Sequence, residues 1–259
     1  MEAEYIGEIL DILSDRLKDD LSLVATSFFG GENYQVISEL PKTKYDKIVF
    51  LTSDEWNQAP PYLNDPSIRY IFKTCVPTML HPKVKPLPLG CFRGYSANGN
   101  TKLINREYDF SFNGQVNSPE REAMKQYLDL YKSQTNKTNF LRYTDSFAKG
   151  TIEDYSEIMD KTKVVLNPSG GSQVTVDSSR YFEGMRAGCV VVSSPRPHVW
   201  FYNGAPHITV YDWKEVSYII ESIMQDRGHL IKLSRSSKEW WNDVCSPQAV
   251  SNYIEKVIQ

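Results

Sequence analysis

One segment, residues 164–193, limits the fold more than any other part of the sequence. It begins with a continuous apolar run at 164–166 and ends with another at 189–192, as expected for strands covered on both faces. Between them lie a glycine-containing loop and a polar run at 177–179 that can cap a helix. Gly188 follows where a helix end needs a left-handed residue. The segment therefore predicts a parallel strand–helix–strand unit.

Such a unit has a preferred place for ligands. The loop after the first strand and the start of the following helix lie at the carboxyl end of that strand, where open α/β sheets bind phosphate groups. Arg180 and Glu183 stand three positions apart, on one face of the predicted helix. A cation and a carboxylate at this place suit the diphosphate and the ribose of one nucleotide.

Strand-like and helix-like segments alternate along most of the chain, which favours parallel sheets with right-handed crossovers. The predicted strands are residues 21–25, 47–51, 68–72, 108–112, 138–141, 163–166, 189–192 and 207–210, and the predicted helices are 5–18, 73–80, 119–132, 153–161, 178–187 and 213–227.

Residues 83–105 interrupt the alternation, contain several prolines and glycines, and are predicted to be a linker. We therefore expect an α/β protein of two Rossmann-like domains, 1–100 and 101–233. Helices with a break at Pro247 are predicted for 234–259. They either pack on the second domain or cross back to the first.

Composition excludes several classes of protein. The net charge is −3 and no basic cluster occurs, which argues against binding nucleic acid. The acidic N-terminus lacks the pattern of a signal peptide, and no apolar run approaches the ~20 residues of a membrane span. The four cysteines are widely spaced and show no metal-ligand spacing. We expect a cytoplasmic protein without a transmembrane segment; peripheral association with a membrane stays open.

Several motifs, in their order along the chain, resemble those of GT-B glycosyltransferases and of the exostosin-like family in particular. They are LNPSGG at 166–171, SSRYFEGMRAGCVVV at 178–192, REYDFSFNG at 106–114 followed by Arg121, PLG at 88–90 and YDW at 211–213. The resemblance is stronger in the second half of the chain than in the first. The chain looks like a compact, soluble member of the bacterial or viral type.

The resemblance implies a GT-B fold, in which two Rossmann-like domains face an interdomain cleft. It implies transfer of a hexose or pentose from a nucleotide-sugar, with a UDP-sugar favoured, to a hydroxyl of a growing glycan. Inversion at the anomeric carbon is expected. The donor would bind to the second domain and the acceptor to the first.

Three charged residues are candidates for holding the donor. The resemblance implies that Glu183 accepts hydrogen bonds from the ribose hydroxyls; the alternative is a surface carboxylate paired with a nearby arginine. Arg180 can grip two phosphate oxygens at once, or it is a solvated helix residue. Arg121, at the expected entry to a helix, can neutralise the leaving diphosphate, or it is a surface arginine.

The loop after the strand at 163–166 offers backbone donors. Ser169, Gly170 and Gly171 allow close approach of a diphosphate to exposed N–H groups, although an ordinary turn would have the same sequence. The Asp-x-Asp motif with which another large fold of sugar transferases holds a divalent ion is absent. We therefore expect no metal and no cofactor, with arginines, N–H groups and the helix N-terminus offsetting the charge.

An inverting transferase needs a base for the acceptor hydroxyl. Asp54 and Glu55 follow the predicted strand 47–51, at the carboxyl end where sites collect. Only one can point into a cleft, and we favour Glu55. Trp56 can stack on an acceptor sugar or pack in the core, and His198 can contact a sugar hydroxyl or be an ordinary loop histidine.

Two other functions fit the same patterns. A sugar-nucleotide epimerase of GT-B-like architecture would need a second acid/base pair near the sugar. A non-catalytic protein that binds sugar nucleotides would need no base at all.

Overall fold

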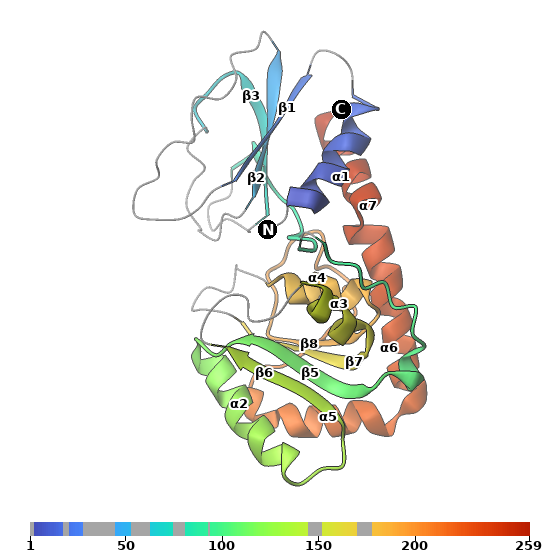
Figure 1. Cartoon of the computed structure of the whole chain (residues 1–259). Coiled ribbons are helices and arrows are strands. Elements are labelled where there is room, and N and C mark those ends of the chain that lie inside the picture. The colour runs from blue at the N-terminus through green and yellow to red at the C-terminus, as the bar shows by residue number, and fades with distance from the viewer. Residues whose placement is uncertain are drawn as a thin grey trace. The chain divides into compact units, whose positions relative to one another are not determined.

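The structure is a computed structural model, and it describes residues 3–17, 21–27, 45–52, 63–74, 81–92, 94–144, 152–169 and 178–259. The chain divides into two compact units (Figure 1). The first combines Met1–Arg93 with Val244–Gln259, and the second is Gly94–Asp243. Each unit contains a sheet whose described strands are all parallel. The expectation of an α/β protein with parallel sheets is confirmed.

The first unit is built on a four-stranded sheet of order β1-β2-β3-β4. Its strands are β1 (Leu21–Ser27), β2 (Asp46–Thr52), β3 (Ile68–Lys73) and β4 (Val84–Pro86). Val49 and Leu51 of β2, Ile68 and Ile71 of β3, and Val84 of β4 form one buried apolar cluster. The register of β2 against β3 and of β3 against β4 brings these side chains to one face.

The two ends of the chain supply helices to this unit. Helix α1 (Ala3–Ser14) packs along α7 (Pro247–Ile258), the last helix of the chain. The Tyr5 hydroxyl donates a 2.6 Å hydrogen bond to the carbonyl of Cys245, and Ser251 of α7 donates to the carbonyl of Ile9. Ile9 is fully buried, so the apolar stripe predicted for the first helix does face protein.

The second unit has a five-stranded sheet of order β6-β5-β7-β8-β9. Its strands are β5 (Tyr108–Gln115), β6 (Asn139–Thr144), β7 (Thr162–Asn167), β8 (Val190–Ser193) and β9 (Ile208–Thr209). Its helices are α2 (Pro119–Lys132), α3 (Ile152–Asp160), α4 (Ser179–Arg186), α5 (Val216–Gln225) and α6 (Arg227–Trp240), with short 3₁₀ turns at Leu103–Asn105 and Trp213–Glu215. A π-helical turn, Trp241–Cys245, follows α6 and contains the point in the chain where the first unit resumes.

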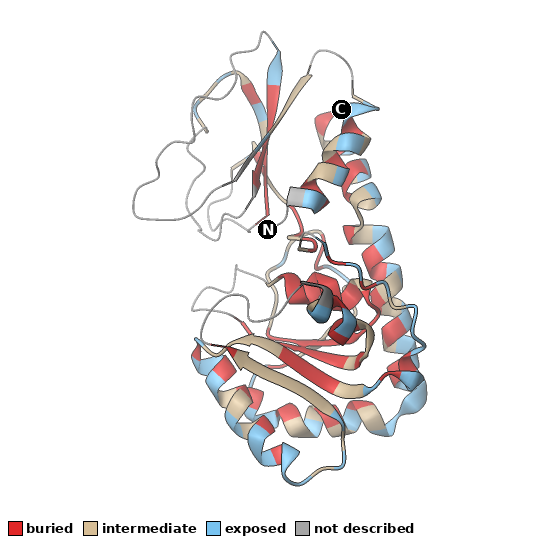
Figure 2. Ribbon diagram, viewed as in Figure 1, coloured by how far each residue is buried: buried red, intermediate tan, exposed pale blue. Residues whose placement is uncertain are grey.

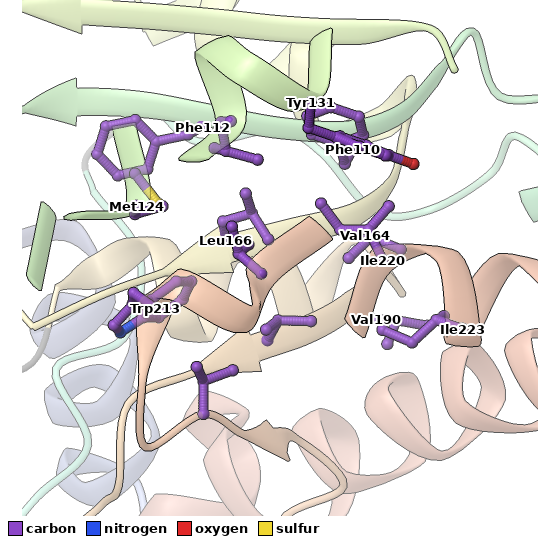
Figure 3. Close-up of a cluster of buried hydrophobic side chains, with 14 of the residues drawn as sticks. Phe110, Phe112, Met124, Tyr131, Val164, Leu166, Val190, Trp213, Ile220 and Ile223 are labelled. Atoms are coloured by element: carbon purple, nitrogen blue, oxygen red, sulfur yellow. The ribbon is translucent and has the colours of Figure 1, made fainter. Parts of the chain in front are cut away.

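Helices cover both faces of this sheet, and burial is concentrated in its central strands (Figures 1 and 2). On one face, Phe110 and Phe112 of β5 and Leu166 of β7 meet Met124 of α2 and Ile220 of α5 (Figure 3). Alternate residues of the strands point the other way, toward α3 and α4. This two-sided burial explains why β7 and β8 are continuous apolar runs in the sequence.

Gly184 is what lets α4 lie close to the sheet. A Cβ atom at this position would come within 2.6 Å of Val165 and 3.2 Å of Val191. The absence of a side chain in the middle of α4 therefore brings the helix against β7 and β8.

Helix α4 ends as the sequence predicts. Gly188 has φ +66°, and its N–H donates to the carbonyl of Met185, while the N–H of Cys189 donates to the carbonyl of Gly184. These are the two bonds of a Schellman motif, which needs a left-handed residue at Gly188.

The start of α4 differs from the expected cap. Ser178 occupies the N-cap position, but its side chain makes no capping bond to the helix. Its hydroxyl donates instead to Oδ1 of Asn167, at 2.6 Å. The serine thus ties the helix to the end of β7.

The predicted linker at 83–105 is more structured than its composition indicates. Val84–Pro86 forms β4, parallel to β3, and Leu103–Asn105 forms a 3₁₀ turn. A three-residue edge strand ending in proline gives too short an apolar pattern to recognise. The helix predicted at 73–80 fails at its first residue, because Lys73 belongs to β3; residues 75–80 lie outside the described part.

Candidate functional site

The order of the strands in the second unit marks one place on its sheet. The chain runs from β5 outward to β6 and then returns to the other side of β5 as β7. The connections after β5 and β7 therefore leave the sheet in opposite directions. In open parallel sheets, ligands bind in the crevice outside the carboxyl ends of the strands at such a switch point. The candidate site thus lies next to Gln115, which ends β5, and Asn167, which ends β7.

Helix α2 begins at this edge. Ser118 is its N-cap and accepts a hydrogen bond from the N–H of Arg121, and Pro119 holds the first helical position. The Arg121 side chain turns back toward the end of β5, where Nη1 donates to the carbonyl of Gln115 at 3.0 Å and to Oδ1 of Asn117 at 2.9 Å. A guanidinium is thereby held beside the positive end of a helix.

A second guanidinium comes from α4. Arg180 extends to β5, where its Nη2 donates to the carbonyl of Asn113 at 2.5 Å. Its Cζ lies 4.6 Å from the centre of the Phe112 ring, a cation–π contact. The strand makes room for it at Gly114, where a Cβ atom would approach Nη2 to 2.3 Å.

These two arginines are buried, close enough to repel one another, and only partly satisfied. Each is 7% exposed. Nε of Arg121 and both Nε and Nη1 of Arg180 are buried without a hydrogen-bond partner among the described residues. Burial first and then the charge of Arg180 lower the pKa of Arg121 to about 10, although Glu120 opposes the shift. Two buried positive charges, with N–H donors that have no partner among the described residues, make this place favourable for binding an anion.

Ser169 is anchored by three bonds. Its N–H donates to the Glu120 carboxylate at 3.1 Å and to the Ser194 hydroxyl at 3.0 Å, and its carbonyl accepts from Ser118. Trp213 donates through Nε1 to the same Ser194 hydroxyl. The N–H of Ser169 therefore differs from the exposed donor that the sequence suggests: it fixes the start of the loop after β7. Gly170 and Gly171 lie outside the described residues.

Glu183 lies one turn after Arg180 and is fully buried. The Tyr95 hydroxyl donates to the Glu183 backbone carbonyl at 2.8 Å. Burial first and then the charge of Glu183 raise the pKa of Tyr155, in α3, well above its usual value. Arg186 lies over the Tyr95 ring, with Cζ 5.5 Å from its centre. Glu183 is therefore not the solvated surface carboxylate of the alternative interpretation.

The other predicted site residues are placed as follows. His198 is exposed, in the connection between β8 and β9. Asp54, Glu55 and Trp56 lie outside the described residues, shortly after the end of β2. Within the described part of the chain, no three His, Cys, Asp or Glu residues gather as a metal site would require.

Sequence reasoning missed Glu120 and Tyr155. Glu120 had a local signal, because a carboxylate in the first turn of a capped helix is common. The hydrogen bond that the Glu120 carboxylate accepts from Ser169, far along the chain, had no signal in the sequence. Tyr155 belongs to a predicted helix, but no local pattern pairs it with Glu183.

No protein-family model and no curated protein matches this sequence. Several solved structures do share its fold. A glycosyltransferase from Rickettsia africae superimposes with a TM-score of 0.56 at 10% identity, over 98% of this chain and 80% of that one. An alpha1,3-fucosyltransferase with GDP-fucose gives a TM-score of 0.51 at 9% identity, over 93% and 92%.

An Anabaena protein, HepE, in complex with UDP and glucose gives a TM-score of 0.52 at 10% identity, over 83% of this chain and 71% of that one. Some matched chains are much longer, and this chain spans about half of their length: it covers 53% of the matched chain in the GtfA/B complex and 50% of that of TarM. The shared fold is a two-domain α/β fold with parallel sheets. At these identities the likeness concerns the fold alone.

The helices carry one further observation. Within the described residues no helix can span a membrane, since α2 and α6 have 14 residues each and a span needs ~20.

Proposed function

We propose that this protein is a glycosyltransferase that moves a sugar from a nucleotide-sugar to a hydroxyl of a glycan. One observation carries the proposal. Arg121 and Arg180 present buried N–H donors that have no hydrogen-bond partner among the described residues, at the switch point of a parallel sheet. A diphosphate matches both the charge and the hydrogen bonds that these two side chains lack.

The same arrangement suits the chemistry of sugar transfer. As the bond between the anomeric carbon and the diphosphate oxygen breaks, negative charge grows on the leaving group. Two guanidiniums and the N-terminus of α2 would stabilise that charge without a metal ion. Their geometry is set before the ligand arrives, by the bonds to Gln115 and Asn113. The proposal is therefore metal-independent.

Glu183 completes the donor site in this proposal, as acceptor for the ribose hydroxyls. It stands one helical turn from Arg180, which is consistent with one ligand that carries ribose and diphosphate together. The fucosyltransferase structure contains GDP-fucose and the HepE structure contains UDP, which supports a donor that carries a nucleoside diphosphate. We favour a UDP-sugar, on the resemblance to exostosin-like enzymes.

The remaining chemistry is proposed for the first unit. Glu55, or else Asp54, would take the proton of the acceptor hydroxyl as it attacks the anomeric carbon with inversion. Trp56 would stack on the acceptor sugar, and His198 of the second unit would contact a sugar hydroxyl. A growing polysaccharide is the acceptor that the resemblance favours.

The first test is a thermal-shift screen with UDP, GDP, CDP, dTDP and their sugars, followed by calorimetry. We expect UDP and UDP-sugars to raise Tm, because a ligand of the native state stabilises it. Arg121→Met should bind UDP at least tenfold more weakly, about 1.4 kcal/mol. Its ligand-free stability should stay within about 1 kcal/mol of wild type, since the lost hydrogen bonds are offset by relief of the repulsion from Arg180.

Arg227→Met, at an exposed position in α6, is the matched control and should leave the affinity unchanged. The absence of a shift with any nucleotide would contradict the proposal. Conversion of a UDP-sugar to another UDP-sugar without an acceptor would indicate an epimerase. Tight binding with no turnover of any kind would indicate a non-catalytic binding protein.

A further inference from the structure

We infer that Glu120 is a positioning residue of the donor site, which holds the first turn of α2, and with it Arg121, against the ends of β7 and β8. The inference rests on the proposed function and names a further residue that serves the same site. It starts from an exposed glutamate whose carboxylate reaches a group of buried polar side chains. The members of this group, each at most 8% exposed, are Ser118, Ser169, Ser194 and Trp213.

The hydrogen bonds of Ser194 show what the carboxylate is needed for. The Ser194 hydroxyl oxygen accepts from the N–H of Ser169 and from Nε1 of Trp213, both at 3.0 Å. With its two lone pairs used in this way, the hydroxyl still has one proton to donate. Oε2 of Glu120 accepts that hydrogen bond, and the same oxygen accepts from the N–H of Ser169 at 3.1 Å. The carboxylate therefore completes the hydrogen bonding of buried groups.

The start of α2 is joined to Ser169 by two hydrogen bonds. The Ser169 N–H donates to Glu120, and the Ser169 carbonyl accepts from the Ser118 hydroxyl at 2.9 Å. Ser118 also caps the helix by accepting from the N–H of Arg121 at 3.3 Å. The two residues that hold Ser169 thus lie just before Arg121 in the chain, and they set its place relative to the end of β7.

These hydrogen bonds join segments that follow different strands of the sheet. Helix α2 comes after β5, Ser169 after β7 and Ser194 directly after β8. All three segments lie at the carboxyl edge of the sheet, where we propose that the diphosphate binds. Glu120 therefore fixes the frame of the anion site without being needed as a contact to the anion.

The rest of α2 is held on the sheet in another way. Met124 and Leu128 are completely buried in the apolar cluster of the second unit. Burial of these side chains stabilises the helix whether or not Glu120 keeps its hydrogen bonds. Loss of those bonds should therefore move the first turn, with Arg121, and leave the helix folded.

Glu120 has two properties that could serve the donor site, its reach and its charge. The charge opposes a bound diphosphate by repulsion. It also acts on Arg121, because it opposes the lowering of the pKa of that guanidinium. A role for the charge and a role for the hydrogen bonds therefore predict different results when one property is removed and the other is kept.

The experiment compares Glu120→Gln with Glu120→Asp by calorimetry with UDP. Glutamine keeps the reach and an acceptor oxygen but loses the charge, whereas aspartate keeps the charge and is one methylene shorter. Glu120→Gln should bind UDP no more than about threefold more weakly than wild type. Glu120→Asp should bind at least about tenfold more weakly, because its carboxylate falls short of Ser169 and Ser194.

Glu122 is the matched control, since it is exposed and lies in the same first turn of α2. Glu122→Gln and Glu122→Asp make the same two chemical changes, and both should bind UDP within about twofold of wild type. Inorganic pyrophosphate is a second probe, because it carries a diphosphate without ribose or base. Its affinity for the Glu120 variants should follow the same order as that of UDP.

The outcomes separate the hydrogen bonds from the charge. The reverse order, with Glu120→Asp close to wild type and Glu120→Gln weakened, would assign the effect to the charge and overturn the inference. A lower Tm of Glu120→Asp with unchanged affinity would mean a merely structural residue, which also overturns it. Wild-type affinity of Glu120→Asp for pyrophosphate would do the same, because the anion would then not depend on Glu120.

The outcomes also separate this inference from the proposed function. If Arg121→Met weakens UDP binding and Glu120→Asp does not, the donor site stands and the positioning role is wrong. If Arg121→Met binds UDP as tightly as wild type, the donor site itself fails, and this inference fails with it.

Discussion

At the scale of single residues, the site depends on a position that has no side chain. Gly114 lies in β5, where a Cβ atom would come within 2.3 Å of Nη2 of Arg180. The obstacle is the end of a flexible side chain, so an added methyl group would displace the guanidinium rather than the backbone. Gly114 therefore controls where the charge of Arg180 is held.

We expect Gly114→Ala to weaken UDP binding at least tenfold, because Arg180 must leave the carbonyl of Asn113. Stability should change by less than about 1 kcal/mol, since alanine restricts the unfolded chain. Calorimetry and thermal melts measure the two effects. Gly7→Ala, in α1 with nothing within 4 Å of the new Cβ, is the control and should bind normally. Wild-type affinity in Gly114→Ala would show that the position of Arg180 does not matter.

The sequence identifies some of these residues and not others, for a physical reason. Arg180 and Glu183 stand out because a helix after a buried strand places them at a predictable edge. Glu120 and Tyr95 act on groups that are distant along the chain, Ser169 and Glu183. Such contacts depend on how helices pack on the sheet, and periodicity does not encode them.

At the scale of elements, hydrogen bonds from one arginine stabilise the amino-terminal ends of strands in the same sheet. Arg106 is buried there, and its guanidinium donates to the carbonyls of Thr162 at 2.7 Å and Ala187 at 2.5 Å. It also contacts the sulfur of Cys189. One side chain thus joins the start of β7 to the end of α4 and the approach to β8.

Arg106→Lys keeps the charge but loses the planar fork that reaches both carbonyls. We expect the free energy of unfolding of the second unit to fall by about 2 to 3 kcal/mol, the range for a buried group losing charged hydrogen bonds. Urea unfolding followed by far-UV circular dichroism measures it. Arg227→Lys, an exposed arginine in α6, should change stability by no more than about 0.5 kcal/mol. The role of Arg106 is wrong if both variants unfold at the same midpoint.

The elements themselves follow the sequence closely wherever a strand is buried on both faces. The predicted strands at 108–112 and 163–166 lie within β5 and β7, and the predicted helix at 119–132 is α2. The structure departs from the prediction where the pattern is short. β9 is two residues long instead of the predicted four. β4 was not predicted, because its three residues end in a proline and lie in a segment rich in proline and glycine. Edge strands bury too little apolar surface to leave a periodic signal.

At the scale of the whole molecule, each unit has an apolar cluster of its own. The first unit combines segments from both ends of the chain. The sequence left open whether the helices at 234–259 pack on the second domain or cross back to the first. In the structure α7 packs on α1, and Arg16, which follows the end of α1, donates to Asn252 at 2.8 Å and lies 3.5 Å from the Glu255 carboxylate. Helix α7 therefore contributes to the stability of the first unit.

Two matched substitutions test whether the units unfold separately. Ile254 of α7 and Ile220 of α5 are both completely buried, and Ile→Ala at either should cost about 2 to 5 kcal/mol. Ile254→Ala should speed hydrogen exchange in α1, α7 and β2, while β5, β7 and α2 keep wild-type protection. Ile220→Ala should give the reverse pattern, because its cluster belongs to the second unit. Exchange measured by mass spectrometry reads both, and faster exchange throughout the chain in either variant would mean that the two units unfold as one.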